Sequence, residues 1–192
     1  MISSGERATG FRDVSIAKAY LPLSTTKLLI DTRRGAAVFV TPDIAVTAAH
    51  NANLLGSDEV IGRSATYDLL FFRPGRPGSP TINEEPHLNE RVLAYGQGAE
   101  GELRVGRGIV TSLDTEVRPL CPSCPMQLAF TFAGDAGKGF SGGPVVDADD
   151  GHLLGIVFGY VEGETRTIFA YDMRLVATEL AEVEKKSAPP NR

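Results

Sequence analysis

Short apolar runs separated by turn residues are the feature that most constrains how this chain folds. Glycine occurs 21 times and proline 12 times, and both are spread along the 192 residues. Short apolar runs between such turn signals are typical of strands, and many of them in succession indicate an all-β barrel or sandwich. The expected strands lie at 27–31, 36–41, 44–48, 68–73, 91–95, 104–112, 127–132, 143–146, 152–160 and 166–171.

One stretch divides this series of expected strands into two halves. Residues 73–80 read RPGRPGSP, which is too rich in proline and glycine for a strand and predicts a linker. We therefore expect an N-terminal unit over residues 1–80 and a C-terminal unit over residues 81–171.

The two ends of the chain predict helices. Residues 172–186 place Met173, Val176, Leu180 and Val183 on one helical face, with Asp172 as the N-cap. Residues 187–192 are expected to form a disordered tail. A short helix is expected within residues 13–21, ending near Pro22.

Charge and hydropathy exclude several classes of function. The formal net charge of −5 gives no electrostatic footprint for nucleic acid or for an anionic membrane. The sequence has no apolar run near 18 residues, so no transmembrane helix is expected. The N-terminal residues lack the basic and apolar regions of a signal peptide, which favours a cytoplasmic protein.

The two cysteines, Cys121 and Cys124, form a CxxC motif. The small number of cysteines agrees with a reducing compartment. An inert surface loop is the preferred interpretation, and a redox pair or half of a zinc site are the alternatives. The sequence has no second CxxC or CxxH motif to complete a zinc site.

Three segments carry the residue types of nucleophilic catalysis. Ser141 lies in the run GFSGGPV, between glycines that allow a tight turn. His50 ends an apolar strand-like run, and Asp68 precedes another. Serine needs a histidine to take its proton and N–H groups to hold the oxyanion, and a carboxylate can orient that histidine.

The order histidine, aspartate, serine resembles the chymotrypsin-like (trypsin-fold) serine proteases, and compact bacterial members most closely. The motifs that carry the resemblance are TAAH ending at His50, YDLL containing Asp68, and SGGPV beginning at Ser141. The resemblance implies two antiparallel β-barrels of chymotrypsin-like type, with the active site between them and a C-terminal α-helix. It implies a serine endopeptidase that acts on protein or peptide substrates.

The resemblance also implies a role for each residue. Ser141 is expected to be the nucleophile, His50 the general base and Asp68 the residue that orients His50. The N–H groups of Gly139 and Ser141 are expected to form the oxyanion hole. Acyl transfer needs only these groups, so neither a cofactor nor a metal is expected. A cytoplasmic protease needs restraint, which leaves room for a regulatory protein partner.

A substrate pocket is implied next to the nucleophile. Asp135 lies six residues before Ser141, where trypsin-like enzymes carry the aspartate that selects Arg or Lys. Residues Phe158, Gly159 and Tyr160 lie in a run that resembles the strand lining that pocket. Gly159 would leave the wall open, and Tyr160 would narrow the entrance. The alternative for Asp135 is an aspartate in an ordinary turn.

The sequence departs from the family pattern at three places, one of which is the glycine-rich run 137–141, an unusual version of the oxyanion loop. Only 18 positions separate His50 from Asp68, which predicts a reduced first barrel and leaves Asp58 as the alternative acid. Phe140 occupies the position that is acidic in zymogen-activated members, where that acid pairs with a newly cut N-terminus. Phe140 cannot form such an ion pair, so maturation by that route is not expected.

Two other functions stay open at the sequence level. One is a protease-like binding module without turnover, and the other is an esterase or acyl transferase that uses the same three residues. An α/β-hydrolase is disfavoured, because its base histidine follows the serine and here only His152 does, eleven residues on.

Overall fold

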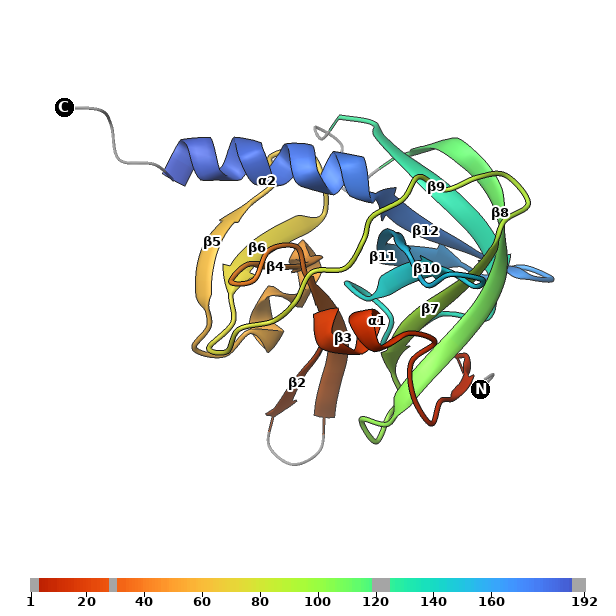
Figure 1. The fold of residues 1–192 in the computed structure, drawn as a ribbon, viewed down its shortest axis with the longest axis horizontal. Helices are drawn as coiled ribbons and strands as arrows, with labels where there is room; N and C mark the ends of the chain where they lie inside the picture. The colour runs from red at the N-terminus through yellow and green to blue at the C-terminus, as the bar shows by residue number, and fades with distance from the viewer. Residues whose placement is uncertain (1–3, 28–30, 119–124, 188–192) are drawn as a thin grey trace.

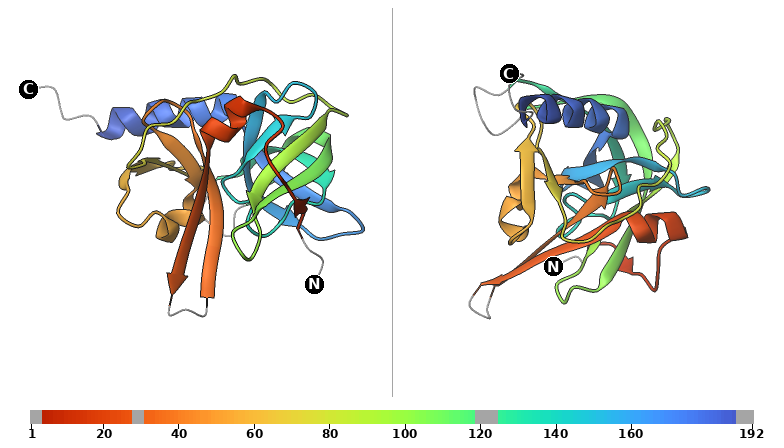
Figure 2. Two further views of the ribbon diagram at one scale, coloured as in Figure 1. Left: turned by 60° about the horizontal axis from the view of Figure 1, so that its bottom comes forward. Right: turned by 60° about the vertical axis from the view of Figure 1, so that its left-hand side comes forward.

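Two antiparallel sheets lie beside each other, and a C-terminal helix runs along one side of both (Figures 1 and 2). The structure, a computed structural model, describes residues 4–27, 31–118 and 125–187. Cys121, Cys124 and the tail from residue 188 onward lie outside the described residues, so the predictions made for them stay predictions. The mostly β architecture with a terminal helix confirms the expected fold class.

The first sheet has five strands in the order β2-β3-β4-β6-β5. Among the described residues, β2 and β5 form the two ends of this order and do not pair with each other, so the first unit is an open sheet. In the fully described segment between His50 and Asp68, β5 is the only strand, which agrees with the short spacing of these two residues. The strands are β2 (Tyr20–Lys27), β3 (Asp31–Phe39), β4 (Ala45–Ala48), β5 (Glu59–Arg63) and β6 (Leu69–Arg73).

The second sheet closes into a barrel. Its order is β1-β8-β7-β10-β11-β12-β9, and β9 pairs back with β8. The strands are β1 (Glu6–Arg7), β7 (Arg91–Gln97), β8 (Leu103–Val117), β9 (Gln127–Gly134), β10 (Pro144–Asp147), β11 (Leu153–Val161) and β12 (Arg166–Asp172). Strand β1 pairs with β8 and so belongs to this second sheet, although it lies within the range expected for the first unit.

Both expected helices are present. Helix α1 (Val14–Ala19) begins after Asp13, whose Oδ1 accepts a 2.6 Å hydrogen bond from the N–H of Ser15. Helix α2 (Met173–Ser187) begins after Asp172, which caps the N–H of Arg174 at 2.7 Å. As expected, Met173, Val176, Leu180 and Val183 form the buried face of α2. None of the helices in the described part of the chain is long and apolar enough to cross a membrane.

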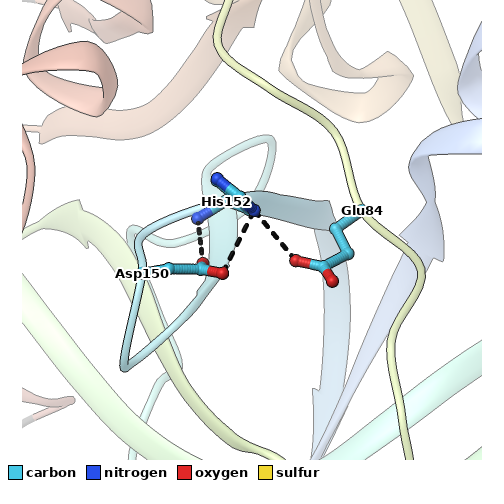
Figure 3. A group of neighbouring side chains, drawn as sticks. All are labelled: Glu84, Asp150 and His152. Atoms are coloured by element: carbon cyan, nitrogen blue, oxygen red, sulfur yellow. Dashed lines mark hydrogen bonds and ion pairs between the residues drawn. The ribbon is translucent and has the colours of Figure 1, made fainter.

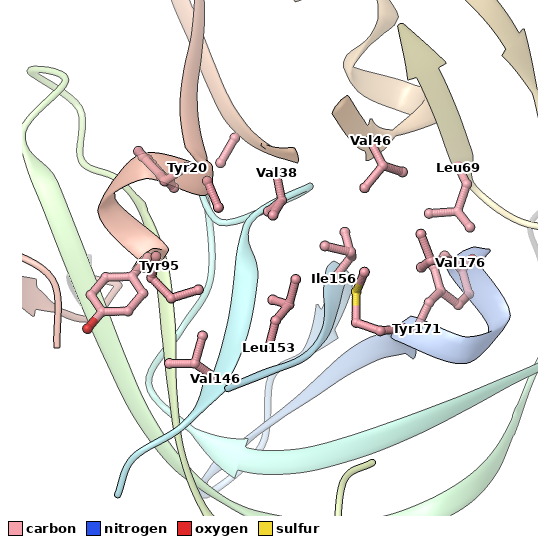
Figure 4. Close-up of a cluster of buried hydrophobic side chains, with 14 of the residues drawn as sticks. Tyr20, Val38, Val46, Leu69, Tyr95, Val146, Leu153, Ile156, Tyr171 and Val176 are labelled. Atoms are coloured by element: carbon pink, nitrogen blue, oxygen red, sulfur yellow. The ribbon is translucent and has the colours of Figure 1, made fainter. Parts of the chain in front are cut away.

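One hydrophobic core joins the two sheets. Val38 and Val46 of the first sheet belong to the same buried cluster as Leu153 and Ile156 of the second, together with Val176 of α2 (Figure 4). Apolar area removed from water stabilises by about 25 cal/mol per Å². The shared core therefore holds the two halves together as one packed body. It fixes the relative positions of residues on either side of the seam between the sheets.

A pair of carboxyl groups connects the residue before β7 to the end of β10. Glu90 precedes β7, and Asp147 ends β10. Burial raises the pKa of Glu90 to about 7, and its hydrogen bond to Asp147 adds to this effect. Glu90 therefore binds a proton more tightly in the folded chain than in the unfolded one. Its contribution to stability is present below the unfolded pKa and is lost as the pH rises through 7.

Replacing Glu90 by glutamine tests this contribution. Glutamine keeps a hydrogen-bond donor toward Asp147 but does not ionise, so Glu90→Gln is expected to gain stability relative to the wild type between pH 5 and pH 8. The free energy of unfolding, measured in urea across this range, checks the difference. Glu164→Gln, at an exposed position in the β11–β12 turn, is the control. Parallel profiles for Glu90→Gln and the wild type would contradict the account.

Candidate active site

Strand pairing brings His50 and Asp68 together. Strands β4 and β6 are antiparallel with Ala48 opposite Leu69, so the residues just after β4 lie next to the residue just before β6. His50 follows β4 in the first turn of a 3₁₀ helix, η1 (Ala49–Leu54). Its Nδ1 lies 2.5 Å from Oδ2 of Asp68, and its backbone N–H donates to Oδ1 of the same carboxylate at 2.9 Å.

The two contacts fix the orientation of the imidazole. A carboxylate at Nδ1 favours the tautomer that carries its proton there, which leaves Nε2 as the acceptor. The His50 side chain is 49% exposed and that of Asp68 is 29% exposed, so Nε2 is within reach of a ligand from solvent. Asp68 makes these contacts, and Asp58, the alternative acid, lies in the turn that follows η1.

The backbone of Ser141 lies against the first sheet. The Ser141 carbonyl accepts hydrogen bonds from the N–H of Ala36 and from Nδ2 of Asn51, each at 2.9 Å. Asn51 is the neighbour of His50 in the chain. Gly142 has a φ of 81°, and a side chain there would collide with the Ala36 carbonyl and with Thr47. The loop that carries Ser141 therefore lies directly against the segment that carries His50.

The loop before Ser141 presents two N–H groups. Residues 137–140 form a turn in which the Phe140 N–H donates to the Gly137 carbonyl at 3.1 Å. Gly139 has a φ of 90°, as the third position of a type II turn requires. Its carbonyl accepts a 3.0 Å hydrogen bond from Gln97 N–H. Within the described residues, the N–H groups of Gly139 and Ser141 donate to no protein acceptor, so both are available to an oxyanion.

Buried polar side chains connect the two halves next to these groups. Nε2 of Gln97 donates to the Leu23 carbonyl at 2.9 Å, across the seam from β7 to β2. The hydroxyl of Tyr171 donates to Oε1 of Gln127 at 2.7 Å and accepts from the Asp68 N–H at 3.1 Å. Sequence reasoning missed Gln97, Gln127 and Tyr171, because a polar residue in a strand does not reveal which segment it will contact.

The residues expected to line a substrate pocket fall into two groups. Phe158 stacks on Tyr171, with ring centroids 3.9 Å apart and an interplanar angle of 8°. A side chain at Gly159 would meet nothing within 4 Å, and Tyr160 lies beneath the Arg166 guanidinium. Asp135 lies on a different element, where its Oδ1 accepts a 2.7 Å hydrogen bond from the N–H of Arg107 on β8.

A separate cluster offers atoms of the kind that bind metals. Nδ1 of His152 lies 2.9 Å from Oε2 of Glu84 and 3.1 Å from Oδ2 of Asp150 (Figure 3). The hydrogen bond to Glu84 raises the pKa of His152, which favours the protonated ring and its ion pairs with the two carboxylates. The three side chains therefore form a cluster of ion pairs that connects Glu84, in the segment between β6 and β7, to the β10–β11 turn.

The comparison with known families places the chain. The trypsin-like peptidase domain family matches residues 29–156, which is more than half of the chain. The chain therefore belongs to the trypsin-like peptidase domain family. No curated protein matches its sequence.

Solved structures confirm the chymotrypsin-like fold. The inactive-form mutant of Rv3671c from Mycobacterium tuberculosis H37Rv superposes with a TM-score of 0.72 at 18% identity, covering 98% of this chain and 100% of that one. The active form of the Rv3671c protease gives 0.74 at 20% identity, covering 88% and 82%. The HtrA-type protease AlgW with a tripeptide gives 0.68 at 18% identity, covering 88% and 61%. At such identities the likeness is one of fold.

The contact between Tyr171 and Asp68 can be tested by removing one oxygen atom. Tyr171→Phe leaves the Asp68 N–H and the Gln127 side chain without this partner, which costs about 1–3 kcal/mol when such groups stay buried. We expect lower stability in urea and lower kcat on any substrate that the wild type turns over. Tyr95→Phe is the control, because it removes a buried hydroxyl that accepts from Arg12 N–H, away from His50. Equal kcat values for the two variants would contradict a role of Tyr171 in holding Asp68.

Proposed function

We propose that this protein is a serine endopeptidase that cleaves peptide bonds through a covalent acyl-enzyme. Ser141 attacks the scissile carbonyl, and Nε2 of His50 accepts the serine proton and later passes it to the leaving amine. Asp68 holds the imidazole tautomer and stabilises the imidazolium. The acyl-enzyme is then hydrolysed by a water that His50 activates in the same way.

The observation that carries the proposal is the double contact of Asp68 with His50, beside a serine loop that has two free N–H groups. The carboxylate engages both the ring and the backbone of His50. Asn51, the next residue, binds the Ser141 carbonyl. The N–H groups of Gly139 and Ser141 are the proposed oxyanion hole, and loss of one such donor typically lowers the rate about 10²–10³-fold.

The proposed substrate class rests on the family to which the chain belongs. Acyl transfer by these residues needs no cofactor. The family is one of peptidases, and AlgW has been solved with a tripeptide bound. We propose protein or peptide substrates for this chain as well. An esterase or acyl transferase would use the same three residues, so comparing amide with ester substrates distinguishes these reactions.

A binding module without turnover is the second candidate function. One structural fact favours it: within the described residues the first sheet, which carries His50 and Asp68, is an open sheet of five strands and not a closed barrel. A fluorophosphonate probe distinguishes the two functions, because only an activated serine reacts with it.

The nucleophile is tested by covalent labelling. A fluorophosphonate is expected to add one adduct per wild-type chain, on the peptide that contains Ser141, as measured by mass spectrometry. Ser141→Ala and His50→Ala are both expected to abolish labelling, because the residues act as a unit and their losses do not add. Circular dichroism checks that the variants are folded. Labelling of Ser141→Ala at the wild-type rate would refute the assignment.

The preference of the protein for the substrate residue before the cleaved bond, P1, is tested by replacing Asp135. Cleavage after Arg or Lys requires that this carboxylate be offered to the substrate, yet it already accepts from the N–H of Arg107. We expect Asp135→Ala to leave the ranking of P1 residues in a peptide library unchanged and to lower stability, since Arg107 loses a partner. A preference for Arg or Lys that disappears in Asp135→Ala would instead place Asp135 in the substrate pocket.

A further inference from the structure

The N-terminal segment Ser4–Arg7 is docked on the loop that precedes Ser141. Strand β1 pairs with β8, with Glu6 opposite Val105 and Arg7 opposite Arg104. The N–H of Gly5 donates to the carbonyl of Asp135 at 2.8 Å. The segment thus adds a short strand to the second sheet. Its residue Gly5 is also hydrogen-bonded to Asp135, the first residue of the loop at residues 135–140.

Gly5 approaches the residue next to the nucleophile. Its φ is 62°, and a Cβ built on it would lie 2.6 Å from the Val105 carbonyl oxygen and 2.9 Å from Cζ of Phe140. Phe140 is fully buried and directly precedes Ser141. Only glycine fits this position without displacing the β8 backbone or the Phe140 ring. The segment therefore forms one wall of the site that holds Phe140.

Two arginines fasten the segment to the loop and to β8. Nη1 of Arg166 donates to Oγ of Ser4 at 3.2 Å and to the Asp135 carbonyl at 3.3 Å. Nη1 of Arg104 donates to the Gly5 carbonyl at 3.0 Å. On the loop itself, a side chain at Gly137 would collide with Ser4. The contacts reach the loop at its first residue, in its middle and at Phe140.

We propose that Ser4–Arg7 is a positioning element for the oxyanion loop. Docked, it holds Phe140 and the turn at residues 137–140, and so keeps the N–H groups of Gly139 and Ser141 aimed at the oxyanion. Its contact with Phe140 is steric and involves no ion pair. This inference rests on the proposed function, because the loop matters to catalysis only if Ser141 is the nucleophile.

Gly5, within the segment, and Gly10, which lies three residues beyond it, provide a matched pair of variants. Gly5→Ala introduces the Cβ that collides with Val105 and Phe140, whereas a Cβ at Gly10 meets nothing within 4 Å. We expect Gly5→Ala to lower kcat by about 10- to 100-fold, approaching the loss of an oxyanion donor, with little change in KM. Gly10→Ala is expected to keep the wild-type kcat. Equal kcat values for Gly5→Ala and Gly10→Ala would overturn the proposal.

Adding the segment as a peptide separates positioning from folding. A chain that lacks residues 1–7 is expected to lose kcat and to recover it, saturably, when a peptide of residues 1–7 is supplied. The same peptide carrying Gly5→Val is expected to restore nothing. Full activity of the shortened chain without peptide would overturn the proposal, and so would equal rescue by both peptides.

A measurement independent of activity distinguishes this proposal from the proposed function. Amide hydrogen exchange of residues 135–143 is expected to be faster in Gly5→Ala than in Gly10→Ala, while exchange in β4 and β6 stays unchanged. Failure of the wild type to react with a fluorophosphonate would refute the proposed function alone. Unchanged exchange of the loop in Gly5→Ala would refute the positioning role, whatever the activity.

Discussion

The Asp68 carboxylate is the group on which the geometry of the site depends. One of its oxygens accepts from the His50 backbone and the other contacts the ring, so both the position and the tautomer of the imidazole follow from one side chain. The carboxylate is itself placed by the pairing of Ala48 with Leu69 between two buried strands. An imidazole held on such a rigid support keeps one orientation.

The remaining contacts join the two halves of the chain, which places the site at the seam between the two sheets. Asn51 binds the Ser141 carbonyl, Gln97 connects the loop before Ser141 to β2, and Tyr171 binds the N–H of Asp68. Each of these contacts is buried or partly buried, where leaving a polar group unpaired costs about 1–3 kcal/mol. A shift of one half against the other would break several contacts at once, which opposes such motion.

The sequence predicts the strands that carry an apolar pattern, helix α2, and the meeting of His50 with Asp68. It does not predict β1, β2 or β5: Glu6 and Arg7 of β1 are exposed and show no pattern of burial, and β5 is largely exposed as well. The prediction of a strand at 27–31 is wrong, because β2 ends at Lys27 and β3 begins at Asp31. It does not predict the partners of Gln97 or Tyr171, because these are set by tertiary packing rather than by local periodicity. The placement of Asp135 against β8 likewise follows from the paths of two loops, and spacing from Ser141 alone does not reveal it.

The most direct test of this account is the proton NMR signal of the His50 ring. A proton held between Nδ1 and a carboxylate resonates far downfield of the backbone amides. The account predicts such a signal in the wild type and in Ser141→Ala, where the contact with Asp68 is intact, and its loss in Asp68→Asn. Its presence in Asp68→Asn, or its absence from the wild type at low temperature, would contradict the claim that Asp68 orients His50.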